Sequence, residues 1–337
     1  MKRRGVTVLL GALITALLSI GVLSAPVPYV VLGPGPTVDT LGTAEDKEVI
    51  QISGTEVSAS AGQLRLTTVG VQPDVKLLAA IVGWFSGEQA VVPYELIYPP
   101  GQTEQQVEER NAEDFRDSQT SAETAALRQL GYPVQVTVRK VVPGGPSANT
   151  LEVGDVITSI DGQPVTTAKK LIELIQAQAS GAELTVGYTR DGTPATAKIT
   201  LVEEGGKPRI GVEVEQEQPH PFELKIDLDK IGGPSAGLMF ALGIIDKVTP
   251  EDLTGGKIIA GTGTIDADGN VGPIGGIPQK LVGAKEAGAQ VFLVPADNCA
   301  EAVRNAQPGL PLLKATNLSQ VLDSLETLRN GGQPPLC

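Results

Sequence analysis

The chain has 337 residues, of which 41% are hydrophobic and 19% are charged, and these proportions are typical of a folded globular protein. Its formal net charge is −13, and only 3% of its residues are aromatic. Both values disfavour nucleic acid as a partner, because phosphates need positive charge and unpaired bases need aromatic rings. The length predicts about two domains, each with its own core.

The first 25 residues differ from the rest of the chain. Lys2, Arg3 and Arg4 precede an uncharged stretch in which Val6 to Ser24 spans 19 residues, close to the roughly 20 that a helix needs to cross a bilayer. Because basic residues stay on the cytoplasmic side, residues 1–25 are predicted to be a cytoplasmic tip and transmembrane anchor. The C-terminal domains of this single-pass cell-membrane protein would then be extracytoplasmic. A cleaved signal peptide is the alternative, since residues 23–25 faintly resemble a cleavage site.

Residues 26–44 are rich in proline and are predicted to form an extended stalk. From about residue 45 the pattern changes to short alternations of apolar and polar residues, which predict strands. The elements expected before residue 120 are strands at 49–52 and 64–69, an amphipathic helix at 75–85, a proline-broken loop at 94–101 and a helix at 103–130.

Residues 120–204 have a distinct pattern of short strands and turns. The sequence Leu-Glu-Val-Gly-Asp-Val-Ile at 151–157 is followed by Asp161-Gly162, which begins six residues after the aspartate of the Gly-Asp pair. A helix is predicted at 167–178, and Asp191-Gly192 marks a hairpin between two further strands. This region resembles a PDZ domain. The resemblance implies binding of protein or peptide segments as an added strand beside a sheet edge.

The predicted peptide groove lies between the edge of a strand at 134–138 and the helix at 167–178. By the same resemblance, the loop at 130–132 would receive a terminal carboxylate. The alternative is a PDZ domain that only packs against its neighbour, because a sheet edge can also be covered. The residues assigned to this groove are Leu130, Gly131, Tyr132, Val134, Val136, Leu171 and Ile175.

Residues 231–237 have the sequence Ile-Gly-Gly-Pro-Ser-Ala-Gly and precede an apolar run with helical spacing. Ser235 is therefore expected at the start of a helix, where unpaired backbone N–H groups can stabilise an oxyanion. Gly232, Gly233 and Pro234 are the candidate oxyanion loop. The simpler interpretation is that the serine only begins the helix, a common role for this residue type.

Lys280 follows Ser235 by 45 positions and is flanked by Ile274, Ile277 and Leu281. A lysine can accept the serine proton only when its amine is neutral, so its pKa must fall from about 10.4 toward 7. Burial among apolar residues has this effect. The alternatives are that Lys280 is a solvated helix residue, or that Lys230 is the base, although a loop lysine would stay hydrated and protonated.

These segments closely resemble the proteolytic domain of the Lon family, and the whole chain resembles a membrane-anchored PDZ-Lon protein. The resemblance implies that Ser235 is the nucleophile, that Lys280 is the general base and that the hydroxyl of Thr262 orients the amine. The shared motifs are Gly-Pro-Ser-Ala-Gly at 233–237, Thr262-Gly263, Gly-Pro-Ile-Gly-Gly-Ile at 272–277, and Lys280.

The predicted fold is α+β, with a Lon-like proteolytic domain at 205–330 and a C-terminal tail at 331–337. Residues 45–119 are predicted to form the first part of the same domain, so that the PDZ domain is inserted into it. A separate N-terminal domain at 45–119 is the alternative. The resemblance also implies a ring-shaped homo-oligomer.

No Gly-x-x-x-x-Gly-Lys-Ser/Thr motif occurs in the sequence. The predicted function is therefore ATP-independent serine endopeptidase activity on unfolded or exposed extracytoplasmic segments. The alternative is a non-catalytic PDZ adaptor with a Lon-like scaffold, although the presence of both Ser235 and Lys280 weighs against it.

Cys299 and Cys337 are the two cysteines, and outside the cytoplasm such thiols tend to pair in a disulfide. Two free thiols are the alternative. Together with the single histidine, His220, they show no metal-ligand spacing, so neither a metal nor a cofactor is predicted.

Overall fold

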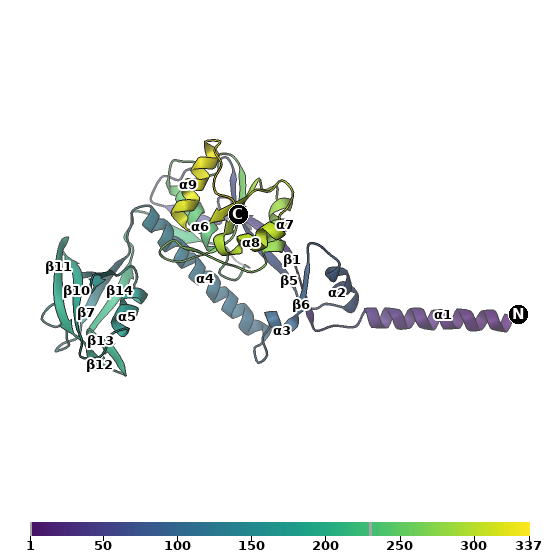
Figure 1. Ribbon diagram of the computed structural model, residues 1–337, viewed down its shortest axis with the longest axis horizontal. Coiled ribbons are helices and arrows are strands. Elements are labelled where there is room, and N and C mark those ends of the chain that lie inside the picture. The colour runs from purple at the N-terminus through teal and green to yellow at the C-terminus, as the bar shows by residue number, and fades with distance from the viewer. Residues whose placement is uncertain (1, 229–230) are drawn as a thin grey trace.

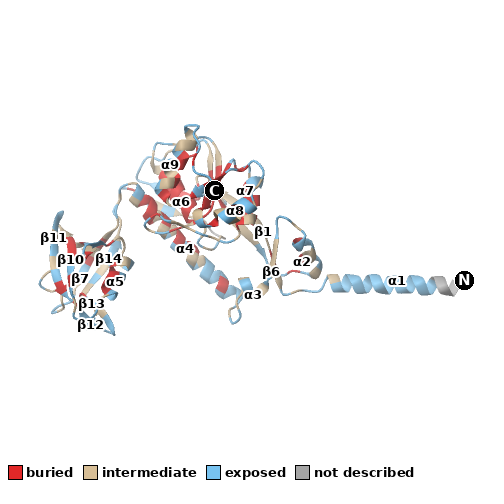
Figure 2. Cartoon of the chain, viewed as in Figure 1, coloured by how far each residue is buried: buried red, intermediate tan, exposed pale blue. Residues whose placement is uncertain are grey.

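The computed structural model describes residues 2–228 and 231–337, arranged in three parts along the long axis of the molecule (Figure 1). The helix α1 (Lys2–Leu23) projects at one end, a mixed helix-and-strand body lies in the centre, and a strand-rich body lies at the other end. From Val6 to Leu23, α1 has a mean hydropathy of 2.5 and no buried residue (Figure 2). It is therefore long and apolar enough to cross a membrane.

The central body is built on a six-stranded sheet with the order β20-β19-β16-β5-β1-β6. The strands from β20 to β5 run parallel, whereas β1 pairs antiparallel with both β5 and β6. The strands are β1 (Tyr29–Asp39), β5 (Gln63–Gln72), β6 (Ala90–Pro93), β16 (Ile258–Gly261), β19 (Val291–Pro295) and β20 (Leu312–Ala315).

Helices cover both faces of this sheet. Because successive side chains of a strand point to opposite faces, Ile259 and Leu293 pack in the core that contains α6, whereas Ala260 and Phe292 pack in the core that contains α7. All residues of β19 are buried, as expected for a strand inside a sheet with two covered faces. The helices of the central body are α4 (Glu104–Gln129), α6 (Gly237–Val248), α7 (Ile277–Glu286), α8 (Cys299–Arg304) and α9 (Leu318–Arg329).

Residues 26–44 do not form a free stalk, because β1 lies inside the sheet between β5 and β6. Val30 is fully buried in this strand. The register between β1 and β5 shifts between Pro34 and Thr37, which accommodates prolines that have no N–H to donate. The high proline content therefore predicted an extended backbone but not its pairing within the sheet.

Segments that precede and follow the strand-rich body in the sequence together form one hydrophobic core. The strand β4 (Ile50–Ser53) pairs with β15 (Glu223–Ile226), β5 lies beside β16, and α4 packs on α6 through Phe115 and Phe240, whose ring centroids are 5.7 Å apart. The segment at 94–101 contains one helical turn rather than a loop alone. The remaining elements here are β2 (Thr43–Ala44), β3 (Lys47–Glu48), α2 (Leu77–Trp84), α3 (Tyr94–Ile97), β17 (Thr264–Ile265), β18 (Val271–Gly272) and the 3-10 turn η1 (Ala296–Asn298).

The strand-rich body has its own hydrophobic core and an antiparallel sheet with the order β11-β10-β8-β7-β14. This body extends from β7 to β14, so it begins and ends later than the PDZ domain predicted at 120–204. Ala122, Ala125 and Ala126 belong instead to the core of the central body, on the long helix α4. The elements are β7 (Gln135–Val141), β8 (Val156–Ile160), β9 (Gln163–Pro164), α5 (Ala168–Gln176), β10 (Glu183–Arg190), β11 (Thr193–Thr200), β12 (Val202–Glu204), β13 (Lys207–Arg209) and β14 (Val212–Glu217).

The C-terminal tail is held at the edge of the central sheet by backbone hydrogen bonds and a disulfide. The N–H of Lys314 donates to the carbonyl of Pro335 at 3.1 Å, and the N–H of Cys337 donates to the carbonyl of Leu312 at 3.0 Å. A disulfide joins Cys299 to Cys337 with a Cα–Cα distance of 5.1 Å. Leu336 therefore pairs with Leu313 of β20 in an isolated antiparallel bridge.

Candidate active site

Ser235 lies at the start of α6, as the sequence predicted, and the surrounding backbone fixes its position. Gly237 is the first residue of the helix, and a Cβ atom there would lie 2.9 Å from the side chain of Ile265. The N–H of Gly263 donates to the carbonyl of Ser235 at 2.9 Å, and the N–H of Leu238 donates to the carbonyl of Gly263 at 3.1 Å. The loop between β16 and β17 therefore holds the start of the helix.

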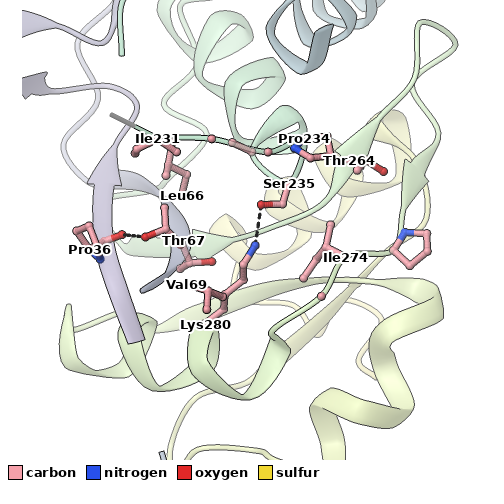
Figure 3. Close-up of a pocket in the computed structure, with 16 residues that line it drawn as sticks. Pro36, Leu66, Thr67, Val69, Ile231, Pro234, Ser235, Thr264, Ile274 and Lys280 are labelled. Carbon is pink, nitrogen blue, oxygen red and sulfur yellow. Dashed lines mark hydrogen bonds between the residues drawn. The ribbon is translucent and has the colours of Figure 1, made fainter. Parts of the chain in front are cut away.

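Lys280 reaches the serine from α7, on the other side of the sheet (Figure 3). Its Nζ donates hydrogen bonds to Ser235 Oγ at 2.8 Å and to Thr262 Oγ1 at 2.8 Å. Thr262 Oγ1 in turn donates to the carbonyl of Ser235 at 3.0 Å. The structure thus brings together the three side chains that the sequence assigned to catalysis.

The amine of Lys280 is buried, and no charged side chain within residues 2–228 and 231–337 pairs with it. The residue is 2% exposed, and burial lowers the pKa of its amine to about 7. Ile277 and Leu281 in the same helix are fully buried, so they supply apolar surroundings. Asp266 and Asp268, which would oppose this shift if close, are both exposed, and the carboxylate of Asp268 pairs with Arg128.

The rival base considered above, Lys230, lies outside the described residues. Within the ranges 2–228 and 231–337, no ion pair involves Lys280. The same ranges contain no group of three or more His, Cys, Asp or Glu side chains that could hold a metal ion.

A cavity of about 560 Å³ opens over Ser235 and Lys280. One wall comes from β5, and the opposite sides come from the serine loop and from the turn before α7 (Figure 3). Side chains and backbone thus surround the serine oxygen with space for a substrate. The lining residues are Pro36, Leu66, Thr67, Thr68, Val69, Ile231, Gly232, Gly233, Pro234, Ser235, Ala236, Thr264, Pro273, Ile274, Gly275 and Lys280.

Part of the predicted oxyanion loop has a different role from the one expected. The N–H of Gly233 donates to the carbonyl of Asn111 on α4 at 2.8 Å, and Pro234 has no N–H. The carbonyl of Pro234 accepts a hydrogen bond from Ser118 Oγ at 3.0 Å. Among the residues described, the N–H groups of Ser235 and Ala236 have no hydrogen-bond partner. These two groups are the better candidates for oxyanion donors.

The groove predicted along residues 134–138 is not at a sheet edge. The strand β7 pairs with β8 on one side and with β14 on the other, so it cannot accept a further strand. Val136 is buried in the core of the strand-rich body. Tyr132 packs against Phe222, with ring centroids 6.0 Å apart. Of the seven residues assigned to the groove, Leu130, Gly131, Tyr132, Val134 and Val136 therefore do not line it.

The other two assigned residues, Leu171 and Ile175 on α5, line a cavity of about 400 Å³ beside β14. This strand ends the sheet, and only its inner side is paired, with β7. Gly211, just before the strand, has a φ of +75°. This site was not predicted from the sequence, in which the glycine between Ile210 and Val212 is its local signal. The other lining residues are Val142, Ile172, Gln176, Glu204, Gly205, Pro208, Arg209, Ile210, Gly211, Val212, Glu213 and Val214.

Two family models match the chain. Residues 105–201 match the PDZ domain, and residues 229–327 match the Lon protease (S16) C-terminal proteolytic domain. The chain combines a PDZ domain with a Lon-type proteolytic domain. The PDZ match begins in α4, whose buried alanines pack in the core of the proteolytic domain.

The Lon-type proteolytic domain has distant relatives among characterised proteins. The chain is 32% identical over 113 residues to Lon protease 2 of Bacillus subtilis (strain 168), which covers 32% of this chain and 20% of that protein. It is also 32% identical over 92 residues to the Lon protease of Koribacter versatilis (strain Ellin345), which covers 27% of this chain and 11% of that protein. The chain therefore spans a fifth or less of the length of these relatives.

Among solved structures, the chain is similar to the PDZ domain of an SdrC-like protein from Listeria monocytogenes. The two share 30% sequence identity, with a TM-score of 0.23, and the match covers 23% of this chain and 85% of the other. A PDZ domain of an SdrC-like protein from Listeria innocua matches at 30% identity and a TM-score of 0.24, over 26% of this chain and 99% of the other.

Proposed function

We propose that this protein is a membrane-anchored serine endopeptidase that cleaves unfolded or exposed extracytoplasmic protein segments without ATP. The observation that carries the proposal is the amine of Lys280, which is buried and lies 2.8 Å from Ser235 Oγ, with no carboxylate of the described residues paired with it. A pKa of about 7 leaves a large fraction of this amine neutral at physiological pH. A neutral amine at this distance can act as the base for the serine.

In the first chemical step, Ser235 Oγ attacks the carbonyl carbon of the scissile peptide bond while Lys280 Nζ accepts the hydroxyl proton. The carbonyl oxygen becomes an oxyanion, and the N–H groups of Ser235 and Ala236 are our candidates for stabilising it. Thr262 Oγ1 holds the amine in line with the serine. The ammonium of Lys280 has only hydroxyl partners, so it can release its proton again.

The tetrahedral intermediate collapses when the C–N bond breaks and Lys280 donates its proton to the leaving amine. An acyl ester on Ser235 remains. Water then attacks the ester carbonyl, Lys280 accepts a proton from that water, and the same proton returns to Ser235 Oγ as the ester bond breaks. At the end of the cycle Ser235 and Lys280 have returned to their starting states, one water has been consumed and one peptide bond has been hydrolysed, and no cofactor takes part.

We also propose that the PDZ domain presents substrates through the cavity between β14 and α5. The outer backbone edge of β14 can accept an extended peptide as an added strand. The apolar side chains of Leu171 and Ile175 would then hold the side chains of that peptide. We assign α1 as the membrane span, with both domains outside the cytoplasm, and we expect the protein to form a homo-oligomer.

Cleavage of a labelled unfolded protein by the full chain in detergent micelles, without ATP, tests this proposal. We expect fragments from the wild type and none from Ser235→Ala. Equal cleavage by both proteins would remove the endopeptidase assignment. Peptide binding to both proteins without cleavage by either would favour the adaptor alternative.

A further inference from the structure

The short helix α2 contains no charged residue, and Phe85, which follows it, is also apolar. Its large apolar side chains are nevertheless turned outward. Trp84 is 55% exposed and Phe85 is 88% exposed, and Leu78 and Val82 are exposed on the same helix. Exposed apolar side chains that cluster in this way indicate a contact surface, whereas single exposed apolar residues are common on any protein.

The inner face of α2 is made of small residues. Ala80 is 1% exposed and packs with Val31 and Val75, and Gly83 is buried. A Cβ atom on Gly83 would lie 2.9 Å from the side chain of Val91. A surface helix of a soluble protein normally directs its large apolar residues inward. In α2 the small residues face the protein and the large ones face away, which indicates that the helix has an apolar medium on its outer side.

The same helix begins where α1 ends. The N–H of Leu77 donates to the carbonyl of Ala25 at 2.9 Å, and the N–H of Val27 donates to the carbonyl of Val75 at 3.0 Å. An apolar hollow of about 480 Å³ joins the two helices. The exposed surface of α1 therefore continues onto α2, at the end of the central body that lies nearest α1 (Figure 1). The residues of this hollow are Ile20, Leu23, Ser24, Lys76, Leu78, Ala79 and Val82.

The flanking residues fit a position at the boundary between lipid and water. Trp84 and Tyr29 form an edge-to-face pair with ring centroids 5.6 Å apart, and such aromatic rings favour the headgroup level. Asp74 and Lys76 precede the helix and Glu88 follows it, and all three are exposed. The apolar stretch is thus bounded by charges that can remain in water.

We propose that α2 and Phe85 lie in the outer interfacial layer of the bilayer and fasten the proteolytic domain to the lipid surface. The proposal rests on the proposed function, in which α1 is the membrane span. Interfacial helices bury their apolar face about 5–10 Å into the boundary between headgroups and acyl chains. Two points of attachment, α1 and α2, then fix the orientation of the central body relative to the membrane.

Lipid is favoured over a second copy of the chain as the medium that covers α2. The hollow between the helices joins its apolar surface to that of α1, and a membrane around α1 would reach the same level. We therefore expect Leu78, Val82, Trp84 and Phe85 to contact acyl chains and headgroups rather than protein.

Trp84 is the single tryptophan of the chain, so selectively excited tryptophan fluorescence reports on α2 alone. The full chain is reconstituted in phosphatidylcholine vesicles whose acyl chains carry bromine close to the headgroups. We expect the brominated lipid to quench Trp84 roughly twofold, as for a side chain at interfacial depth. Lipid with bromine near the bilayer centre should quench it less.

The matched control moves the reporter to the PDZ domain. The variant Trp84→Phe combined with Val153→Trp places the tryptophan at an exposed position between β7 and β8 of the strand-rich body, and its fluorescence should not respond to brominated lipid. Trp84 that is quenched by acrylamide but not by bromine would lie in water, and Trp84 that is quenched by neither would be covered by protein. Either result overturns the proposal.

The two proposals fail in different ways. Extraction of the vesicles at alkaline pH releases a protein without a membrane span. A released chain would overturn the assignment of α1 and, with it, the inference about α2. A retained chain whose Trp84 does not respond to brominated lipid would overturn the inference about α2 alone.

Discussion

Among the described residues of the central body, two lysines are buried, and the groups around them differ. Lys280 is 2% exposed, and its hydrogen-bond partners are the hydroxyls of Ser235 and Thr262. Lys247 is 5% exposed, and its amine donates to the carboxylate of Glu48 at 3.0 Å and to the carbonyl of Ile50 at 2.6 Å. Burial alone therefore does not mark a catalytic lysine. Burial makes the charged form of Lys280 unfavourable, and no carboxylate among the described residues offsets this effect.

The largest expected effect separates the two lysines by activity. Lys280→Met should lower kcat/KM for a peptide substrate by roughly 10³-fold or more, as is typical when one member of a catalytic pair is removed. Lys247→Met should keep activity near that of the wild type while lowering the free energy of unfolding, because the carbonyl of Ile50 loses its donor. Peptide hydrolysis and urea unfolding of both variants measure this. Equal activity of the two variants would contradict the proposal that only Lys280 acts in catalysis.

The second prediction places a carboxylate beside Lys280, so that its surroundings resemble those of Lys247. Thr262→Asp should raise the pKa of the Lys280 amine. The pH at which activity reaches half of its maximum on the rising limb should therefore increase by about 1–3 pH units. The wild-type midpoint is expected at about 7, with activity rising as the amine loses its proton.

The control for that substitution is Thr262→Val, which removes the hydroxyl without adding charge. It should lower kcat/KM by roughly 10-fold through loss of positioning and leave the midpoint unchanged. Rate profiles between about pH 5 and pH 10 separate the two variants. A midpoint that stays near 7 in Thr262→Asp would contradict the electrostatic explanation.

The third prediction concerns stability and pH. The folded protein holds the pKa of Lys280 at about 7, below the ordinary value of 10.5. Between these values the unfolded chain binds one more proton than the folded protein, so the free energy of unfolding should rise with pH in this window, by up to about 1.4 kcal/mol per pH unit. Below pH 7 both states are protonated and this contribution to the slope disappears.

In Lys280→Met the rise should be absent, because methionine does not titrate. Urea unfolding of both proteins at several values within that window measures the difference between their slopes. Identical slopes would show that the Lys280 amine has the same pKa in the folded and unfolded states.

The smallest effect is expected at Glu48, whose side chain is 57% exposed although it pairs with Lys247. Because water screens this ion pair, Glu48→Gln should lower the free energy of unfolding by less than about 1 kcal/mol. Peptide hydrolysis should be unchanged. A loss of activity would indicate that the surroundings of Lys247 also act on the catalytic site.

Local sequence patterns predicted the candidate catalytic side chains and some of the strands. The glycine-rich serine loop and the apolar residues around Lys280 are local signals, and each positions its own side chain at a helix start. The hydrogen bonds from Lys280 to Ser235 and Thr262 then depend on the parallel strands β16 and β19, which pack against α6 on one face of the sheet and α7 on the other.

Features set by pairing between distant segments could not be predicted in the same way. The strand β14 covers β7, although about 70 residues separate the two, and no local pattern distinguishes an inner strand from an edge strand. The place of β1 inside the sheet depends likewise on β5 and β6. For α2 the sequence predicted a helix, but which of its faces packs on the protein became clear only from Ala80 and Gly83.

The most direct test of the central claim is the titration of the Lys280 amine itself. In the full chain labelled with ¹³C at lysine Cε, the Lys280 resonance is assigned by its loss in Lys280→Arg and followed with pH in the Ser235→Ala background. We predict a midpoint close to 7. A midpoint near the ordinary value of 10.5 would mean that the amine is charged at neutral pH and cannot act as the base for Ser235.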